Sequence, residues 1–185
     1  DGTYIKLSAR SKQKINPFDF TTNSYGGTEN LVEHIQDLTE IISLMVDGLN
    51  SEEKAIVDKA IIQTYKQFRY SMKEEPENPK KKKAKRGRPR KLQAYPLLKD
   101  LYKTLKVMKQ RKLYTRLEKF VKGSLGGVFD SQTNIALDNR LVVFDIKDLS
   151  ESLRQIMMFV VASFVFNQVK KDPVKRILLI DEGWM

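Results

Sequence analysis

The chain has 185 residues, a formal net charge of +11, one histidine and no cysteine. The lack of cysteine excludes disulfides, thiolate catalysis and zinc–thiolate sites, and one histidine cannot form a histidine cluster. Residues 156–166, the longest strongly apolar stretch, are shorter than the ~20 residues of a membrane-spanning helix, and no signal peptide is visible. We therefore expect a reducing, cytoplasmic setting.

The positive charge is concentrated in one segment. Residues 80–91 contain nine basic and no acidic residues, so the rest of the chain carries only +2. This distribution favours a single basic contact segment over a broad basic face.

The first part of the chain reads as strand pieces and loops, followed by two helices. Tyr4, Ile5 and Leu7 give a short strand pattern, and Pro17 interrupts the next stretch. From about residue 28, apolar residues recur three and four positions apart, which predicts a helix. These residues are Leu31, Ile35, Leu38, Ile42, Met45 and Leu49. Asn50 and Glu53 then have the spacing of a capping box for a second helix.

His34 is expected on a helix surface or with one satisfied hydrogen bond. Tyr65, Phe68 and Tyr70 suit either core packing at a helix end or the stacking of nucleic-acid bases.

A charged segment separates these helices from two more. Residues 72–93 lose the apolar pattern, which predicts a disordered basic loop. Pro96 is tolerated at the start of a third helix, and a fourth ends near Gly123. Four amphipathic helices in succession predict a helical lobe over residues 28–122.

The remaining residues predict an α/β unit. Residues 141–146 form a β-rich apolar run, residues 150–171 read as a helix, and residues 176–181 as a buried strand. A strand, helix and strand of these lengths predict two adjacent parallel strands with a right-handed crossover. The fold class is therefore α/β. Residues 1–27 are the first part of the α/β domain, residues 28–122 the helical lobe, and residues 123–185 the βαβ part.

Asp181 and Glu182 lie where ligands bind in such sheets, beyond the carboxyl end of a strand. An Asp there can hold Mg²⁺ through oxygen ligands, and a following Glu can polarise the water that attacks a nucleotide. The alternative is a buried strand that simply ends in solvated acids. The glycines of residues 123–127 do not have the Gly-x-x-x-x-Gly-Lys-[Ser/Thr] spacing of a phosphate loop, which occurs nowhere in the chain.

Five segments in this order resemble the large ATPase of type IV secretion and conjugative-transfer systems, the VirB-type traffic ATPase. They are Asp1-Gly-Thr-Tyr4, Ile15-Asn-Pro-Phe-Asp19, residues 123–130 with Thr133-Asn134, residues 141–146 with Asp148-Leu149, and residues 178–184 (Leu-Leu-Ile-Asp-Glu-Gly-Trp). The resemblance implies part of a RecA-like P-loop ATPase sheet with an all-helical insertion lobe.

That resemblance also implies ATP and Mg²⁺ as cofactors, Asp181 as the magnesium-organising acid and Glu182 as the catalytic, water-activating residue. Gly183 stands before Trp184, where the family usually has a small residue, and we count it as a mild departure from the family pattern. The phosphate loop would precede Asp1, so we expect an internal piece that is inactive alone. The intact protein is expected to be a hexamer, peripheral at the cytoplasmic membrane, with other secretion subunits as partners.

Residues 85–91 also resemble an AT-hook, an extended basic segment that reads the minor groove of A·T-rich DNA. The residues concerned are Lys85, Arg86, Gly87, Arg88, Pro89, Arg90 and Lys91. Arginines are drawn to the negative potential of a narrow minor groove. Residues 80–91 could equally contact phosphates without sequence preference, or an anionic lipid surface.

Two other functions stay open. The first is a non-enzymatic DNA-binding protein that uses this loop. The second is a helical interaction module with a degenerate nucleotide site.

Overall fold

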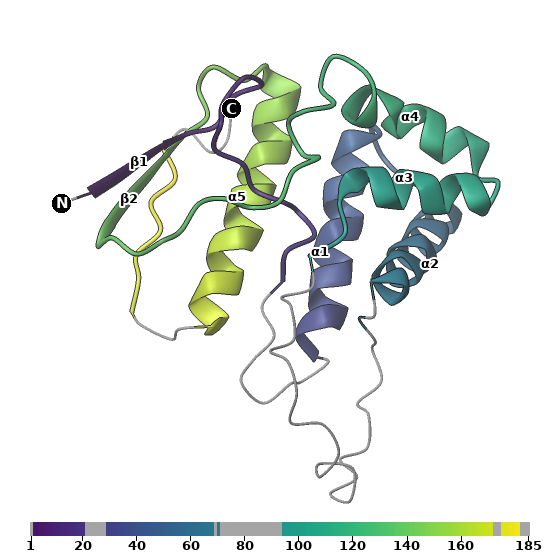
Figure 1. Cartoon of the computed structure of the whole chain (residues 1–185), viewed down its shortest axis with the longest axis horizontal. Helices are drawn as coiled ribbons and strands as arrows, with labels where there is room; N and C mark the ends of the chain where they lie inside the picture. Colours follow the sequence, from purple (N-terminus) through teal and green to yellow (C-terminus); the bar gives the residue numbers. More distant parts are fainter. Residues whose placement is uncertain (1, 21–28, 69, 71–93, 172–174, 182–185) are drawn as a thin grey trace, which may run out of the picture.

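The computed structural model describes residues 2–20, 29–68, 70, 94–171 and 175–181. Its elements, in chain order, are β1 (Gly2–Lys6), α1 (Glu29–Met45), α2 (Ser51–Gln67), α3 (Leu98–Val107), α4 (Arg111–Val121), β2 (Leu141–Asp145) and α5 (Glu151–Lys171). Figure 1 shows the sheet and α5 on one side of α1, and α2, α3 and α4 on the other.

The two strands form a parallel pair in which Gly2 is opposite Leu141 and Lys6 is opposite Asp145. Side chains alternate as a half-buried sheet requires, so Ile5 enters the core while Tyr4 is 59% exposed. The expected α/β character and the strand near residues 141–146 are confirmed. The expected pairing is wrong, because β2 pairs with β1 and not with residues 176–181.

The buried strand expected at residues 176–181 is not formed. Residues 175–180 have no regular secondary structure, and Ile177 and Leu179 are 89% and 88% exposed. An apolar run becomes an interior parallel strand only where neighbouring strands pair with it and helices cover both of its faces. In the described part of the chain the sheet has two strands, so this cover is missing.

The four helices expected between residues 28 and 122 are all present. The Asn50 side chain accepts a hydrogen bond from the Glu53 backbone N–H at 2.8 Å, and the Glu53 carboxylate accepts one from the Asn50 N–H at 3.1 Å. The predicted capping box is therefore confirmed, and it satisfies two N–H groups that a helix start leaves unpaired. The turn before it contains Gly48 at φ 99°, a conformation that suits glycine.

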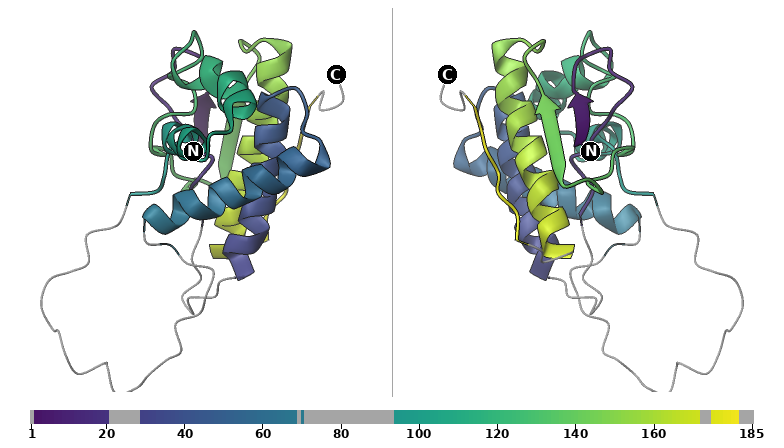
Figure 2. Two further views of the ribbon diagram at one scale, coloured as in Figure 1. Left: turned by 90° about the vertical axis from the view of Figure 1, so that its right-hand side faces the viewer. Right: turned by 90° about the vertical axis from the view of Figure 1, so that its left-hand side faces the viewer.

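Helix α1 is the centre of the molecule. It packs against α2 on one side and against α5 on another, and Figure 2 shows α1 and α5 side by side. Its residues Leu38 and Met45 are fully buried. One hydrophobic cluster therefore runs from the sheet through α1 to the helices beyond.

His34 lies on the buried face of α1, with 2% of its surface exposed. Neither ring nitrogen has a hydrogen-bond partner. The expectation of a surface or hydrogen-bonded histidine is therefore wrong: the ring stacks on Phe20, with 5.6 Å between ring centroids. Nothing in the helical spacing distinguishes this aromatic environment from a polar one.

Helix α5 is only partly covered by the rest of the protein. Ile156, Met157 and Val160 are buried, but Phe159 and Phe166 are 51% and 59% exposed. By length and composition alone α5 could cross a membrane, a test that the core helix of a soluble protein also passes. Its inner face packs on α1.

Candidate functional site

The carboxyl ends of β1 and β2 meet at one edge of the sheet, because the strands are parallel and in register. Ligands of open α/β sheets bind beyond such edges. Lys6 and Asp145, the last residues of the two strands, face each other there, and Lys147 and Asp148 follow directly. This carboxyl edge is the part of the described structure where a ligand site is expected.

The charged side chains of the carboxyl edge are engaged in hydrogen bonds and an ion pair within the chain. The Tyr4 hydroxyl donates a hydrogen bond to Asp145, whose other oxygen accepts the Lys147 backbone N–H at 3.0 Å. The Lys6 ammonium lies 2.5 Å from an Asp148 oxygen. The bond from Tyr4 lowers the pKa of Asp145, and the bond to Asp148 raises the pKa of Lys6. Both groups are therefore charged at neutral pH.

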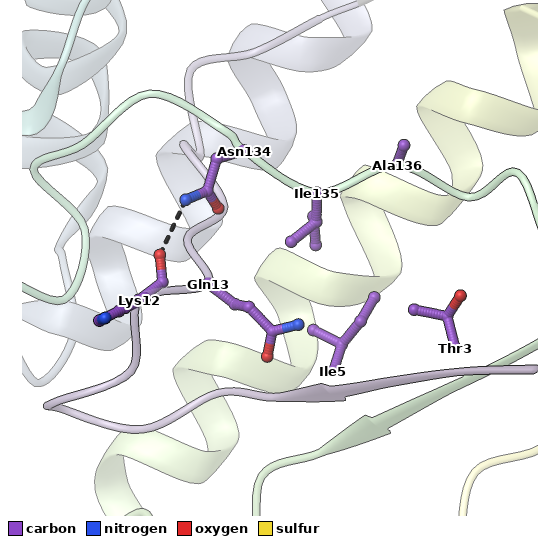
Figure 3. Close-up of a pocket in the computed structure, with 7 residues that line it drawn as sticks. All are labelled: Thr3, Ile5, Lys12, Gln13, Asn134, Ile135 and Ala136. Carbon is purple, nitrogen blue, oxygen red and sulfur yellow. Dashed lines mark hydrogen bonds between the residues drawn. The ribbon is translucent and has the colours of Figure 1, made fainter.

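A cavity of about 300 Å³ lies on the inner side of β1 (Figure 3). It is lined by Thr3, Ile5, Lys12, Gln13, Asn134, Ile135 and Ala136. The Asn134 amide donates to the Lys12 carbonyl at 2.8 Å, and its oxygen accepts the Lys14 N–H at 2.7 Å. The Gln13 oxygen accepts the Lys6 N–H at 2.8 Å. The polar groups of the lining are thus largely occupied by the chain itself, which makes this cavity a poor ligand site.

Asn16 explains why the second and third family-like segments occur together. Its backbone N–H donates to the Thr133 hydroxyl at 2.9 Å. Its side-chain amide donates to Asp19 and to the Pro96 carbonyl, both at 2.9 Å, and its oxygen accepts the Phe18 N–H at 3.1 Å. Asn16 is 1% exposed. These bonds join residues 15–19, the start of α3 and the segment before β2.

Asp19 is the acid of this junction. Burial raises its pKa, while hydrogen bonds from Thr133 and Asn16 oppose that effect. The junction is therefore an internal polar network that fixes chain segments, and its carboxylate is turned toward partners within the chain.

The predicted catalytic residues are only partly described. Asp181 is exposed and follows the segment 175–180 that forms no strand. Glu182 and the basic residues 85–91 lie outside the described residues. No group of three or more metal-ligating side chains occurs in the described part of the chain. The contacts among Tyr4, Lys6, Asp145 and Asp148 were not predicted, because they depend on the register of β1 with β2.

The predicted base-stacking role of Tyr65 is not supported by its place in the fold. Its hydroxyl donates to the Phe18 carbonyl at 2.7 Å, and the ring is 1% exposed. Tyr70 stacks on Tyr95 with 5.4 Å between ring centroids. Core packing, the other prediction for these aromatics, accounts for Tyr65 and Tyr70.

The fold and the carboxyl edge define an α/β protein with a helical lobe beside a parallel sheet. Comparisons with protein-family models and with curated proteins found no match. Among solved structures, the chain is similar to the structure of VirB4 of Thermoanaerobacter pseudethanolicus, with a TM-score of 0.75 and 24% sequence identity. The match covers 100% of this chain and 68% of that chain. The predicted resemblance to a VirB-type protein is thereby confirmed for the fold.

Proposed function

We propose that this chain is part of an ATPase that powers substrate transfer or pilus assembly in a type IV secretion or conjugation system. The observation that carries the proposal is the likeness to VirB4 over the whole chain, with a TM-score of 0.75. The five family-like segments support it independently, because they include the Asp181-Glu182 pair at the end of an apolar run. A RecA-like sheet has more strands than the two of the described sheet, so the larger sheet is part of this proposal.

In this proposal Asp181 organises Mg²⁺ through its oxygens, and Glu182 polarises the attacking water. Bound Mg²⁺ would supply neutralisation of phosphate charge. The described residues do not by themselves fit ATP and Mg²⁺: Asp181 is a single exposed carboxylate, and the chain has no phosphate-loop pattern. We therefore predict that the 185-residue chain alone hydrolyses no ATP.

The partners and location of the intact protein are part of the same proposal. It would act as a hexamer on the cytoplasmic side of the membrane, against other subunits of the secretion complex. Residues 80–91 would contact DNA or an anionic surface. The alternative function, a non-enzymatic DNA-binding protein, requires these residues alone and gives no role to Glu182.

The test is magnesium-dependent ATP hydrolysis by the longer protein that contains this chain, compared with its Glu182→Gln variant. Loss of a general base costs roughly 10²- to 10⁴-fold in rate. We expect turnover to fall by that factor while nucleotide binding is retained. Glu52→Gln, an exposed change on α2, is the matched control and should leave the rate unchanged.

Two results would contradict the proposal. One is equal turnover by the Glu182→Gln variant and the unaltered protein, and the other is the absence of ATP hydrolysis in both. Loss of DNA binding on deletion of residues 80–91, in a protein without ATPase activity, would establish the alternative function.

A further inference from the structure

The basic character of this chain extends beyond residues 80–91 into the part of the chain that the structure describes. Residues 92–123 contain nine basic and two acidic residues, a net charge of +7. Residues 80–123 together carry +16, so the rest of the chain carries −5. The balance of +2 outside residues 80–91 therefore conceals two regions of opposite sign. The positive one, residues 92–123, contains the α3–α4 hairpin, which comprises α3, residues 108–110 and α4 (Figure 1).

Most cations of the hairpin region are paired, and the exceptions are adjacent. The pairs are Lys99–Asp130, Lys103–Asp100, Lys112–Glu53, Arg116–Glu53, Lys119–Asp47 and Lys122–Glu118. Lys106, Lys109 and Arg111 have no carboxylate partner among the described residues. All three are exposed, and they lie within six positions of one another at the hairpin turn.

The backbone of the turn and two aromatic rings fix where these cations lie. α3 ends at Val107 and α4 begins at Arg111, and Lys109 reverses the chain between them with φ 59°. The Lys106 ammonium lies 5.2 Å from the Tyr102 ring centroid and 5.4 Å from that of Tyr114. The two aromatic rings hold Lys106 in place without neutralising its charge.

We propose that the turn of the α3–α4 hairpin binds the phosphate backbone of a nucleic acid through Lys106, Lys109 and Arg111. Three uncompensated cations on one turn suit a dense line of phosphates. A helix that binds a membrane surface buries an apolar face in the lipid. The apolar residues Leu105 and Leu113 are instead buried in the core of this protein.

An acidic protein partner fits the hairpin less well. Protein interfaces depend on apolar or aromatic anchors that enter pockets. Val107, 74% exposed, is the one large exposed hydrophobic residue of the described hairpin. The site does not depend on ATP hydrolysis, nor on residues 80–91.

The test measures binding of a fluorescent duplex oligonucleotide by the full chain as salt is varied. The nine basic residues of residues 80–91 are first changed to glutamine, so that this segment contributes no positive charge. The hairpin variant then adds Lys106→Gln, Lys109→Gln and Arg111→Gln. Each phosphate contact contributes about 0.9 to the slope of log affinity against log salt. We expect the slope to fall by roughly 2 to 3 and the affinity at low salt by tenfold or more.

The control removes the same charge elsewhere, through Lys12→Gln, Lys59→Gln and Arg140→Gln, which are all exposed positions. We expect at most a twofold loss from it, with circular dichroism unchanged in both variants. Equal losses from the two triple variants would overturn the proposal, as would no duplex binding in the protein with neutral residues 80–91. Polyglutamate or phosphatidylserine vesicles that compete as well as DNA at equal charge would overturn the assignment to nucleic acid.

Discussion

At the scale of the residue, the burial of His34 makes the stability of the folded protein depend on pH. Burial lowers its pKa to about 4, although the Phe18 backbone acts in the opposite direction. In the unfolded chain the pKa returns to about 6.5. Between these values the unfolded state binds more protons, so stability falls as the pH drops from 6.5 towards 4. Each pKa unit corresponds to about 1.4 kcal/mol, so this loss is about 3 kcal/mol.

We therefore expect His34→Leu to flatten the pH dependence of unfolding between pH 6.5 and 4, measured by urea titration. Asp37→Asn is the control, because partial desolvation raises the pKa of Asp37 against the opposing effects of Lys170 and Ser163, so that its contribution has the opposite sign. A protonated Asp37 favours the folded state, so stability from this group is lost as the pH rises. An unchanged slope in His34→Leu would mean that the histidine is hydrated in solution.

Asn16 gives a second prediction at this scale. Truncation to alanine leaves the buried Pro96 carbonyl and Phe18 N–H without their partners. An unsatisfied buried group costs about 1–3 kcal/mol. We expect Asn16→Ala to lower the free energy of unfolding by roughly 2–4 kcal/mol, since two groups are affected. The exposed Asn139→Ala is the control, and equal effects of the two changes would contradict the role of Asn16 as a junction.

At the scale of the element, the helices were predictable and the sheet was only partly so. The spacing of Leu31 to Met45 repeats within one helix, and the Asn50 cap acts three residues away, so local sequence determines both. Pairing of β1 with β2 joins residues about 140 positions apart, which no local pattern specifies. For the same reason the contacts of Tyr4 with Asp145 were missed. The role of Asp181 was predicted from the adjacent pair Asp181-Glu182 alone, and it stays a prediction.

Arg116 on α4 determines how the fourth helix meets the first two. Its guanidinium donates to the Val46 and Gly48 carbonyls and lies 3.4 Å from Glu53. We expect Arg116→Ala to lower the free energy of unfolding by about 1–3 kcal/mol, because hydrogen bonds from charged groups are lost. Lys112→Ala, which removes a 75% exposed partner of the same Glu53, should cost less than about 1 kcal/mol. Urea unfolding of both variants measures the difference. Equal losses would contradict the proposed role of Arg116 in joining α4 to the first two helices.

At the scale of the whole molecule, apolar surface is left uncovered in two places. Phe159 and Phe166 face outwards on α5, and Ile177 and Leu179 are almost fully exposed. Exposed apolar patches and unpaired extended segments promote association between copies of a chain. The same surfaces would be covered if residues 176–181 joined a larger parallel sheet, as the proposed RecA-like motor requires. The isolated chain and the proposed motor therefore differ in what these residues contact.

Ile177→Ser with Leu179→Ser tests this difference in the 185-residue chain. Surface changes away from special features alter stability by less than about 0.5 kcal/mol, so urea unfolding should hardly change. Self-association, measured by sedimentation velocity over a range of concentrations, should decrease. Leu38→Ala, at a fully buried position of α1, is the contrasting control and should cost about 2–5 kcal/mol. A loss of 2 kcal/mol or more from the serine pair would mean that residues 176–181 already pack as a strand in solution, because only buried apolar side chains contribute on that scale.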